Sequence, residues 1–99
     1  MAIGVIATIT IQEGKSSAFE AEFLALAAKV NANEPGCVFY SLQRSKSNPL
    51  IYKVLEQYQT AADVEVHGKT DYFKAANKVL ATLVAAAPEI EVLDTVEAL

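Results

Sequence analysis

The sequence is 99 residues long, with 53% hydrophobic residues, 20% charged residues and a formal net charge of −4. This length suits a single domain that spans residues 1–99, and the hydrophobic content excludes a disordered chain. The 8 lysines and arginines are scattered along the sequence, so we expect no nucleic-acid partner.

Cys37 is the only cysteine, so no disulfide can form within one chain. This usage is typical of a reducing compartment. Residues 1–7 have no cationic leader, and no apolar run approaches the roughly 20 residues that a membrane-spanning helix needs. We therefore expect a cytoplasmic protein without a secretion signal or a membrane partner.

Residues 2–12 alternate in the manner of a strand, with isoleucine, valine and alanine at the odd positions. Ser17 followed by Glu20 is a capping-box pattern, which predicts that a helix begins there. Apolar residues then recur at helical spacing, and Pro35–Gly36 is expected to end the helix.

Two further strands are predicted at residues 37–44 and 50–58, which are dense in β-branched and aromatic residues. The intervening residues 45–49 have turn chemistry, so a hairpin is the simplest connection. One face of the strand 50–58 carries Tyr52, Val54, Glu56 and Tyr58.

A cap pattern at Thr60 predicts a short helix that extends to about His67. A longer helix with one apolar stripe should follow over residues 73–87, and Pro88 should end it. Residues 90–96 alternate again and predict a last strand.

This order of elements predicts an α+β domain with the ferredoxin-like βαββαβ arrangement, in which one antiparallel sheet carries both helices on one face. The other face of the sheet would remain uncovered in a monomer. Because the chain is rich in apolar residues, we expect two such sheets to pack face to face in a homodimer.

Several short motifs resemble those of the antibiotic biosynthesis monooxygenase family, and the resemblance extends over nearly the whole chain. It implies a dimeric α/β barrel. It also implies oxidation of quinols or polycyclic phenols by molecular oxygen, with neither a metal nor a flavin, so no cofactor is expected. The motifs are Pro35–Gly36–Cys37, Tyr40, Glu56, Tyr58 and the run from His67 to Phe73.

The haem-degrading relatives of this superfamily provide a contrast. They place a haem-ligating histidine on the last helix and an asparagine on the first strand, and the corresponding positions here are Asn77 and Ala7. Their pocket tryptophan corresponds to His67. The comparison disfavours haem degradation and leaves Asn77 as a candidate for substrate binding.

His67 is the candidate general base, because imidazole is the side chain that exchanges protons most readily near neutral pH. The alternative is a helix-end histidine that bonds to backbone or solvent. Glu56 is the second candidate catalytic residue, and we expect it to orient His67. A carboxylate that is solvated, or paired across the sheet, is the alternative for Glu56.

Aromatic side chains are the candidates for the walls of a pocket that binds a small planar aromatic or quinol-like substrate. Ordinary core packing is the alternative for each of them. We assign Tyr52 and Phe39 to the core. The candidate substrate-binding aromatic residues are Tyr40, Tyr58, Tyr72 and Phe73.

Metal binding and nucleophilic catalysis are not expected. His67 has no companion ligands at metal-binding spacing, and Cys37 has no cationic neighbours in the sequence that would activate a thiol. The leading hypothesis is a cofactor-independent monooxygenase. One alternative is an isomerase or another enzyme that processes a small metabolite without oxygen, and a second is a noncatalytic dimer that binds a hydrophobic metabolite as a sensor or stress-response protein.

Overall fold

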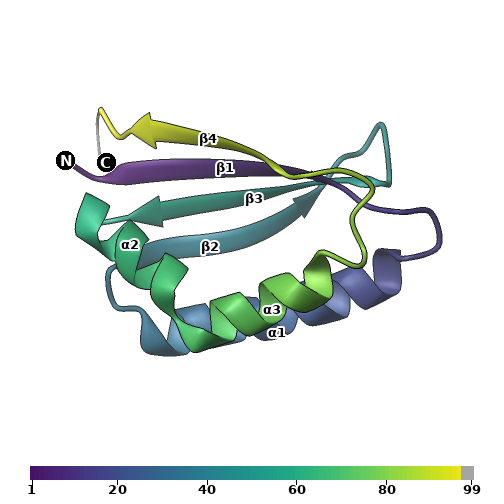
Figure 1. The fold of residues 1–99 in the computed structure, drawn as a ribbon. Coiled ribbons are helices and arrows are strands. Elements are labelled where there is room, and N and C mark those ends of the chain that lie inside the picture. Colours follow the sequence, from purple (N-terminus) through teal and green to yellow (C-terminus); the bar gives the residue numbers. More distant parts are fainter. Residues whose placement is uncertain (97–99) are drawn as a thin grey trace.

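The structure, a computed structural model, describes residues 1–96, so the last part of the predicted domain 1–99 lies outside it. The elements are β1 (Ile3–Thr10), α1 (Ser16–Asn33), β2 (Cys37–Arg44), β3 (Ile51–Tyr58), α2 (Ala61–Lys69), α3 (Asp71–Leu80) and β4 (Glu89–Asp94). The strands form one antiparallel sheet with the order β2-β3-β1-β4, and the helices cover one face of it (Figure 1). This confirms the ferredoxin-like α+β fold.

The predicted alternation along β1 and β3 is confirmed. The register pairs Val5 with Glu56 and Ala7 with Val54, so these side chains share the sheet face that the helices cover. The last strand ends at Asp94, before the predicted end at residue 96. No helix among residues 1–96 is long and apolar enough to cross a membrane.

The start of α1 differs from the predicted capping box. The N-cap residue is Lys15, without a side-chain cap, and Ser17 lies inside the first turn. The Glu20 carboxylate instead accepts hydrogen bonds from the Tyr52 hydroxyl and from Arg44 Nη1. A tertiary contact therefore replaces the local one, and the capping-box prediction was wrong.

The break between α2 and α3 falls at Thr70. The Thr70 hydroxyl donates to the carbonyl of His67 at 2.9 Å and accepts from the amide of Phe73 at 3.3 Å. One side chain thereby ends α2 and caps α3. The short helix extends to Lys69, slightly beyond its predicted end, and the predicted cap at Thr60 is confirmed by a bond from the Asp63 amide.

The helix predicted over residues 73–87 is shorter in the structure. It corresponds to α3, which ends at Leu80 and not at Ala87. The backbone that follows bonds to the end of β1. The Gln12 amide donates to the carbonyl of Leu83 at 2.9 Å, and the Ala85 amide donates to the carbonyl of Thr10 at 2.8 Å. Residues 81–88, which we call the crossing segment, therefore run from α3 back to the sheet.

The sheet face opposite the helices carries an apolar patch, which we call the open sheet face. A β-bulge between Cys37 and Phe39 shifts the register there, and Phe39 is 46% exposed. The assignment of Phe39 to the core was therefore wrong, whereas Tyr52 is fully buried as predicted. The apolar residues of the open sheet face are Ile6, Phe39, Leu55 and Leu93.

Candidate active site

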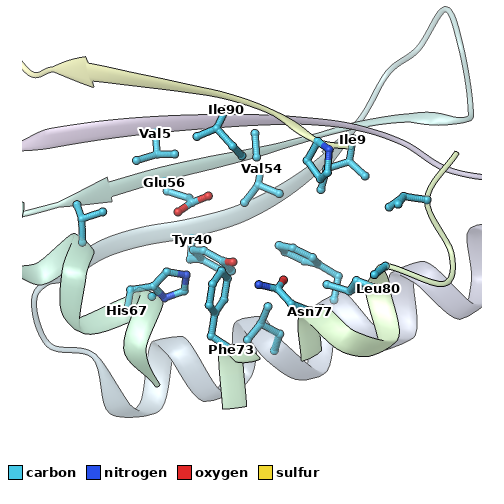
Figure 2. Close-up of a pocket in the computed structure, with 18 of the residues that line it drawn as sticks. Val5, Ile9, Tyr40, Val54, Glu56, His67, Phe73, Asn77, Leu80 and Ile90 are labelled. Carbon is cyan, nitrogen blue, oxygen red and sulfur yellow. The ribbon is translucent and has the colours of Figure 1, made fainter. Parts of the chain in front are cut away.

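A cavity of about 660 Å³ lies between the helix-covered face of the sheet and the helices (Figure 2). Its walls are mostly apolar and come from all four strands, all three helices and the crossing segment. This volume is within the usual range for small-molecule sites. The predicted site residues that line it are Tyr40, Glu56, Tyr58, His67, Phe73 and Asn77.

His67 is only 5% exposed and is held among aromatic rings. Its ring centroid lies 4.4 Å from that of Phe73, 5.2 Å from that of Tyr40 and 5.6 Å from that of Tyr58. The last turn of α2 supplies the histidine and the first turn of α3 supplies Phe73, so the Thr70 corner sets their separation. His67 is therefore not a solvated helix-end histidine.

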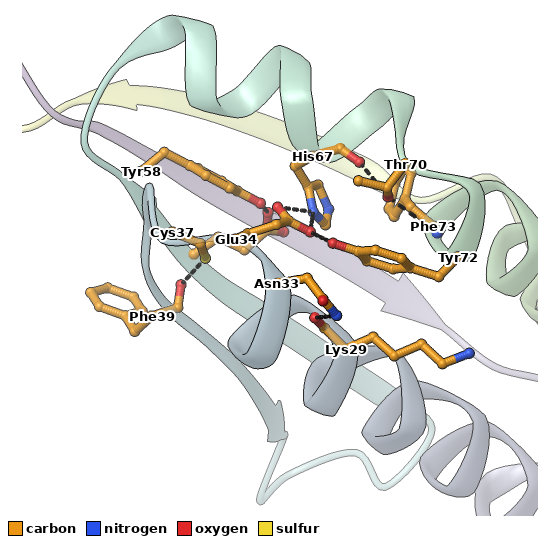
Figure 3. Close-up of polar contacts among 11 residues, drawn as sticks. Lys29, Asn33, Glu34, Cys37, Phe39, Tyr58, His67, Thr70, Tyr72 and Phe73 are labelled. Carbon is orange, nitrogen blue, oxygen red and sulfur yellow. Dashed lines mark hydrogen bonds and ion pairs between the residues drawn. The ribbon is translucent and has the colours of Figure 1, made fainter.

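A carboxylate that was not among the predicted site residues holds His67. The Nδ1 atom lies 2.9 Å from Glu34 Oε1 and 3.1 Å from Glu34 Oε2 (Figure 3). Glu34 is 6% exposed, and it also accepts a hydrogen bond from the Tyr72 hydroxyl. Because an ionised carboxylate only accepts, Nδ1 carries the proton in this contact and Nε2 is the nitrogen left for a ligand.

Two predicted placements are thereby corrected. Glu56 does not orient His67 through a hydrogen bond, because Glu34 occupies Nδ1 and Glu56 Oε1 accepts from the Tyr58 hydroxyl at 2.6 Å. Tyr72 does not line the cavity, because its hydroxyl is directed to Glu34 behind the histidine. Tyr72 therefore belongs to the support of His67.

One sequence signal could have indicated Glu34. It is the C-cap residue of α1, where the negative end of the helix dipole disfavours an acidic side chain. An acidic residue at such a position suggests a compensating tertiary partner. Glu34 lies just before Pro35–Gly36, and its partner His67 lies 33 residues further along the chain.

Burial raises the pKa of Glu56 above its ordinary value, and the negative charge of Glu34 adds to this effect. The hydrogen bond from Tyr58 and the proximity of His67 lower the pKa of Glu56 and offset part of the rise. Glu56 therefore takes up a proton at a higher pH than a solvated glutamate does.

We expect Glu56→Gln to raise the melting temperature at neutral pH. Since the folded-state pKa of Glu56 is raised, its protonated form favours folding, and that contribution is lost as the pH rises through the folded-state pKa. The gain should vanish in acid below the ordinary glutamate pKa. Thermal unfolding at neutral pH and at a pH below the ordinary glutamate pKa tests this, with the exposed Glu65→Gln as the control. An equal rise in melting temperature at both pH values would contradict the prediction.

The phenols and the thiol near the cavity stay protonated at neutral pH. Burial raises the pKa of Tyr58 and of Tyr40, and it raises the pKa of Tyr72 to about 12. Burial, with the charges of Glu34 and Glu56, raises the pKa of Cys37 to about 11. A thiol with this pKa is a poor nucleophile at neutral pH.

Within residues 1–96, no group of three or more histidine, cysteine or acidic side chains is placed to hold a metal ion. The site is thus a largely apolar pocket, open to solvent beside the exposed Ile90 and Val92 of β4, with one imidazole oriented by a buried carboxylate. Such a site suits binding of an aromatic molecule and transfer of a proton to or from it.

Comparison with known proteins identifies the family. The sequence profile of the antibiotic biosynthesis monooxygenases matches residues 2–79. A crystal structure from Caulobacter crescentus CB15, named provisionally as such a monooxygenase, is 53% identical with a TM-score of 0.95, and the match covers 97% of this chain and 91% of that one. The chain therefore belongs to the antibiotic biosynthesis monooxygenase family.

Two more distant structures, also named provisionally as antibiotic biosynthesis monooxygenases, have the same fold. One from Nitrosomonas europaea is 18% identical with a TM-score of 0.92, over 96% of this chain and 90% of that one. One from Bordetella bronchiseptica is 26% identical with a TM-score of 0.80, and the match covers 97% of this chain and 98% of that one. No protein of curated function matches the sequence.

Proposed function

We propose that the protein is a cofactor-independent monooxygenase that oxidises a quinol or polycyclic phenol with molecular oxygen. The observation that carries the proposal is the buried His67, which Glu34 holds at Nδ1 while the ring lies on the wall of an aromatic pocket. Membership of the monooxygenase family supports the type of reaction. The class of substrate and the use of molecular oxygen are the parts of this function that we propose.

The proposed reaction starts when Nε2 of His67 takes the proton of the substrate hydroxyl. The resulting phenolate passes one electron to oxygen, and the two radicals combine to form a carbon–oxygen bond at a ring carbon that bears hydrogen, ortho or para to the phenolate oxygen. The imidazolium returns its proton to the peroxide anion. Loss of water, which takes the hydrogen of that carbon and one oxygen atom, leaves the quinone. One phenol and one oxygen molecule thus give one quinone and one water, and a quinol in the same way gives a hydroxyquinone.

The pocket would assist this reaction by positioning the substrate and by excluding water. Tyr40 and Phe73, which contact the His67 ring, are placed to pack against an aromatic substrate. Asn77, on the next turn of α3, can bond a second substrate oxygen (Figure 2). Glu56, bonded to Tyr58, contributes a polar group beside the hydroxyl site.

Oxygen-electrode measurements over a panel of quinols and polycyclic phenols test the proposal. We expect oxygen uptake with one equivalent of quinone formed per oxygen, unchanged by a metal chelator. Conversion of a metabolite without oxygen uptake would instead favour an isomerase or related enzyme of this fold. Saturable binding without any turnover would favour a noncatalytic sensor or stress-response protein.

We further propose that the protein is a homodimer in which the open sheet faces of two subunits pack together. Leu55 and Ile6 are opposite each other in the register and have no helix above them. Burying this patch against a second copy would remove apolar surface from water. A cytoplasmic location agrees with the single free thiol at Cys37.

Leu55→Glu should shift the protein from dimer to monomer at micromolar concentration, because burying an unpaired charge in the interface costs several kcal/mol. Light scattering after size-exclusion chromatography measures the effect. Leu24→Glu is the matched control, since Leu24 is 58% exposed on α1, away from the open sheet face. A wild-type monomer, or equal dissociation by both variants, would contradict this interface.

A further inference from the structure

The charges around the cavity are unevenly distributed. None of the lysines and arginines, all of which lie within residues 1–96, lines it. The acidic groups are Glu56 in the wall and Glu34 directly behind His67. A carboxylate or phosphate on a bound molecule would therefore meet two acidic side chains and no permanent cation.

The polar groups of the pocket are also grouped in space. Glu56 and His67 lie together at the end near α2, and Asn77 lies between Phe73 and Leu80 (Figure 2). Beyond Asn77 the walls are apolar, from Ile9 to the crossing segment. A ligand that fits this distribution has one hydroxyl at the α2 end and an uncharged ring system beyond it.

We propose that this pocket selects neutral hydroxylated aromatic molecules over those that carry a carboxylate or phosphate group. An anion would lose hydration without gaining a cationic partner. The carboxylates of Glu56 and Glu34 would in addition repel it. The inference rests on the proposed function in taking this cavity as the substrate site.

Isothermal titration without oxygen at neutral pH tests the selectivity. The probes are naphthols that carry, on the ring remote from the hydroxyl, a methyl ester, a carboxamide or a carboxylate group. The ester and the carboxamide should bind at least about tenfold more tightly than the carboxylate, a difference of about 1.4 kcal/mol. Equal or tighter binding of the carboxylate would overturn the proposal, and so would the absence of binding by all three.

A variant with an added cation connects the selectivity to this cavity. Ala81 lines the cavity at the C-terminus of α3 and is exposed, where a lysine is well tolerated. Ala81→Lys should reduce the preference for ester over carboxylate about three- to tenfold, because a cation near the cavity offsets the anion's desolvation. Ala81→Gln, of similar length, should leave the preference unchanged. An equal change in both variants would contradict the electrostatic cause.

The selectivity and the oxidation can fail separately. Neutral probes that bind to a protein that oxidises no quinol would contradict the proposed reaction and leave the charge selectivity in place. Oxidation of carboxylated quinols in preference to their esters would contradict the selectivity and leave the monooxygenase proposal in place.

Discussion

Replacing His67 by alanine should lower the rate of quinol oxidation about 10²- to 10⁴-fold, the usual contribution of a general base. His67→Gln should lose a similar factor, because glutamine fills much of the space without accepting a phenolic proton as a base. Oxygen uptake with the best substrate of the panel is the measurement. The loss should appear mainly in kcat if the histidine acts after the substrate has bound.

Three controls separate chemistry from folding. Circular dichroism should show folded protein, anaerobic titration should show that the variant still binds a neutral naphthol, and free imidazole should restore part of the activity of His67→Ala. An alanine variant that oxidises quinols at the wild-type rate would remove His67 from the mechanism, even if the pocket proved to be the binding site.

Glu34→Ala should destabilise the fold by about 2–6 kcal/mol, because each buried hydrogen-bond donor left without an acceptor costs about 1–3 kcal/mol. Two buried donors lose their acceptor, because both His67 Nδ1 and the Tyr72 hydroxyl bond to this carboxylate. Urea unfolding gives the change in the free energy of unfolding. A midpoint equal to that of the wild-type protein would show that water or another group replaces Glu34 at no cost.

Two milder variants separate the contributions of the two hydrogen bonds that Glu34 accepts. Glu34→Gln keeps an acceptor oxygen and should cost about 1–3 kcal/mol, whereas Tyr72→Phe removes one hydrogen bond and should cost about 1 kcal/mol. Glu34→Gln should also lower kcat, since a neutral amide stabilises the imidazolium less well than a carboxylate does. If Glu34→Gln loses stability but keeps its full kcat and pH profile, Glu34 has a structural role only.

The sheet and the general order of elements could be predicted because their signals are local. Alternation along β1 and β3 and the cap at Thr60 depend on neighbouring residues, and the structure agrees with them. The end of α3 could not be predicted in this way. Residues after Leu80 have good helix formers, but Gln12, far away in the sequence, bonds to the carbonyls of Thr82, Leu83 and Val84.

The pocket was predictable in part for a similar reason. The polar aromatic residues and His67 are concentrated in one part of the sequence, and most of them line one cavity. The orienting carboxylate was assigned to Glu56, which lies closer to His67 along the chain than Glu34 does. Which of two acidic residues reaches Nδ1 depends on where α1 ends above the sheet, and spacing along the chain does not determine that.

The crossing segment has a consequence for how relatives of this protein could diverge. It lines one end of the cavity with irregular backbone that is tied to the sheet at only a few points, such as the bridge between Ile11 and Val84. Loop backbone of this kind tolerates insertions and deletions far better than a helix or strand does. A change in its length would alter the depth of the cavity while the imidazole and its carboxylate, at the opposite end, keep their positions.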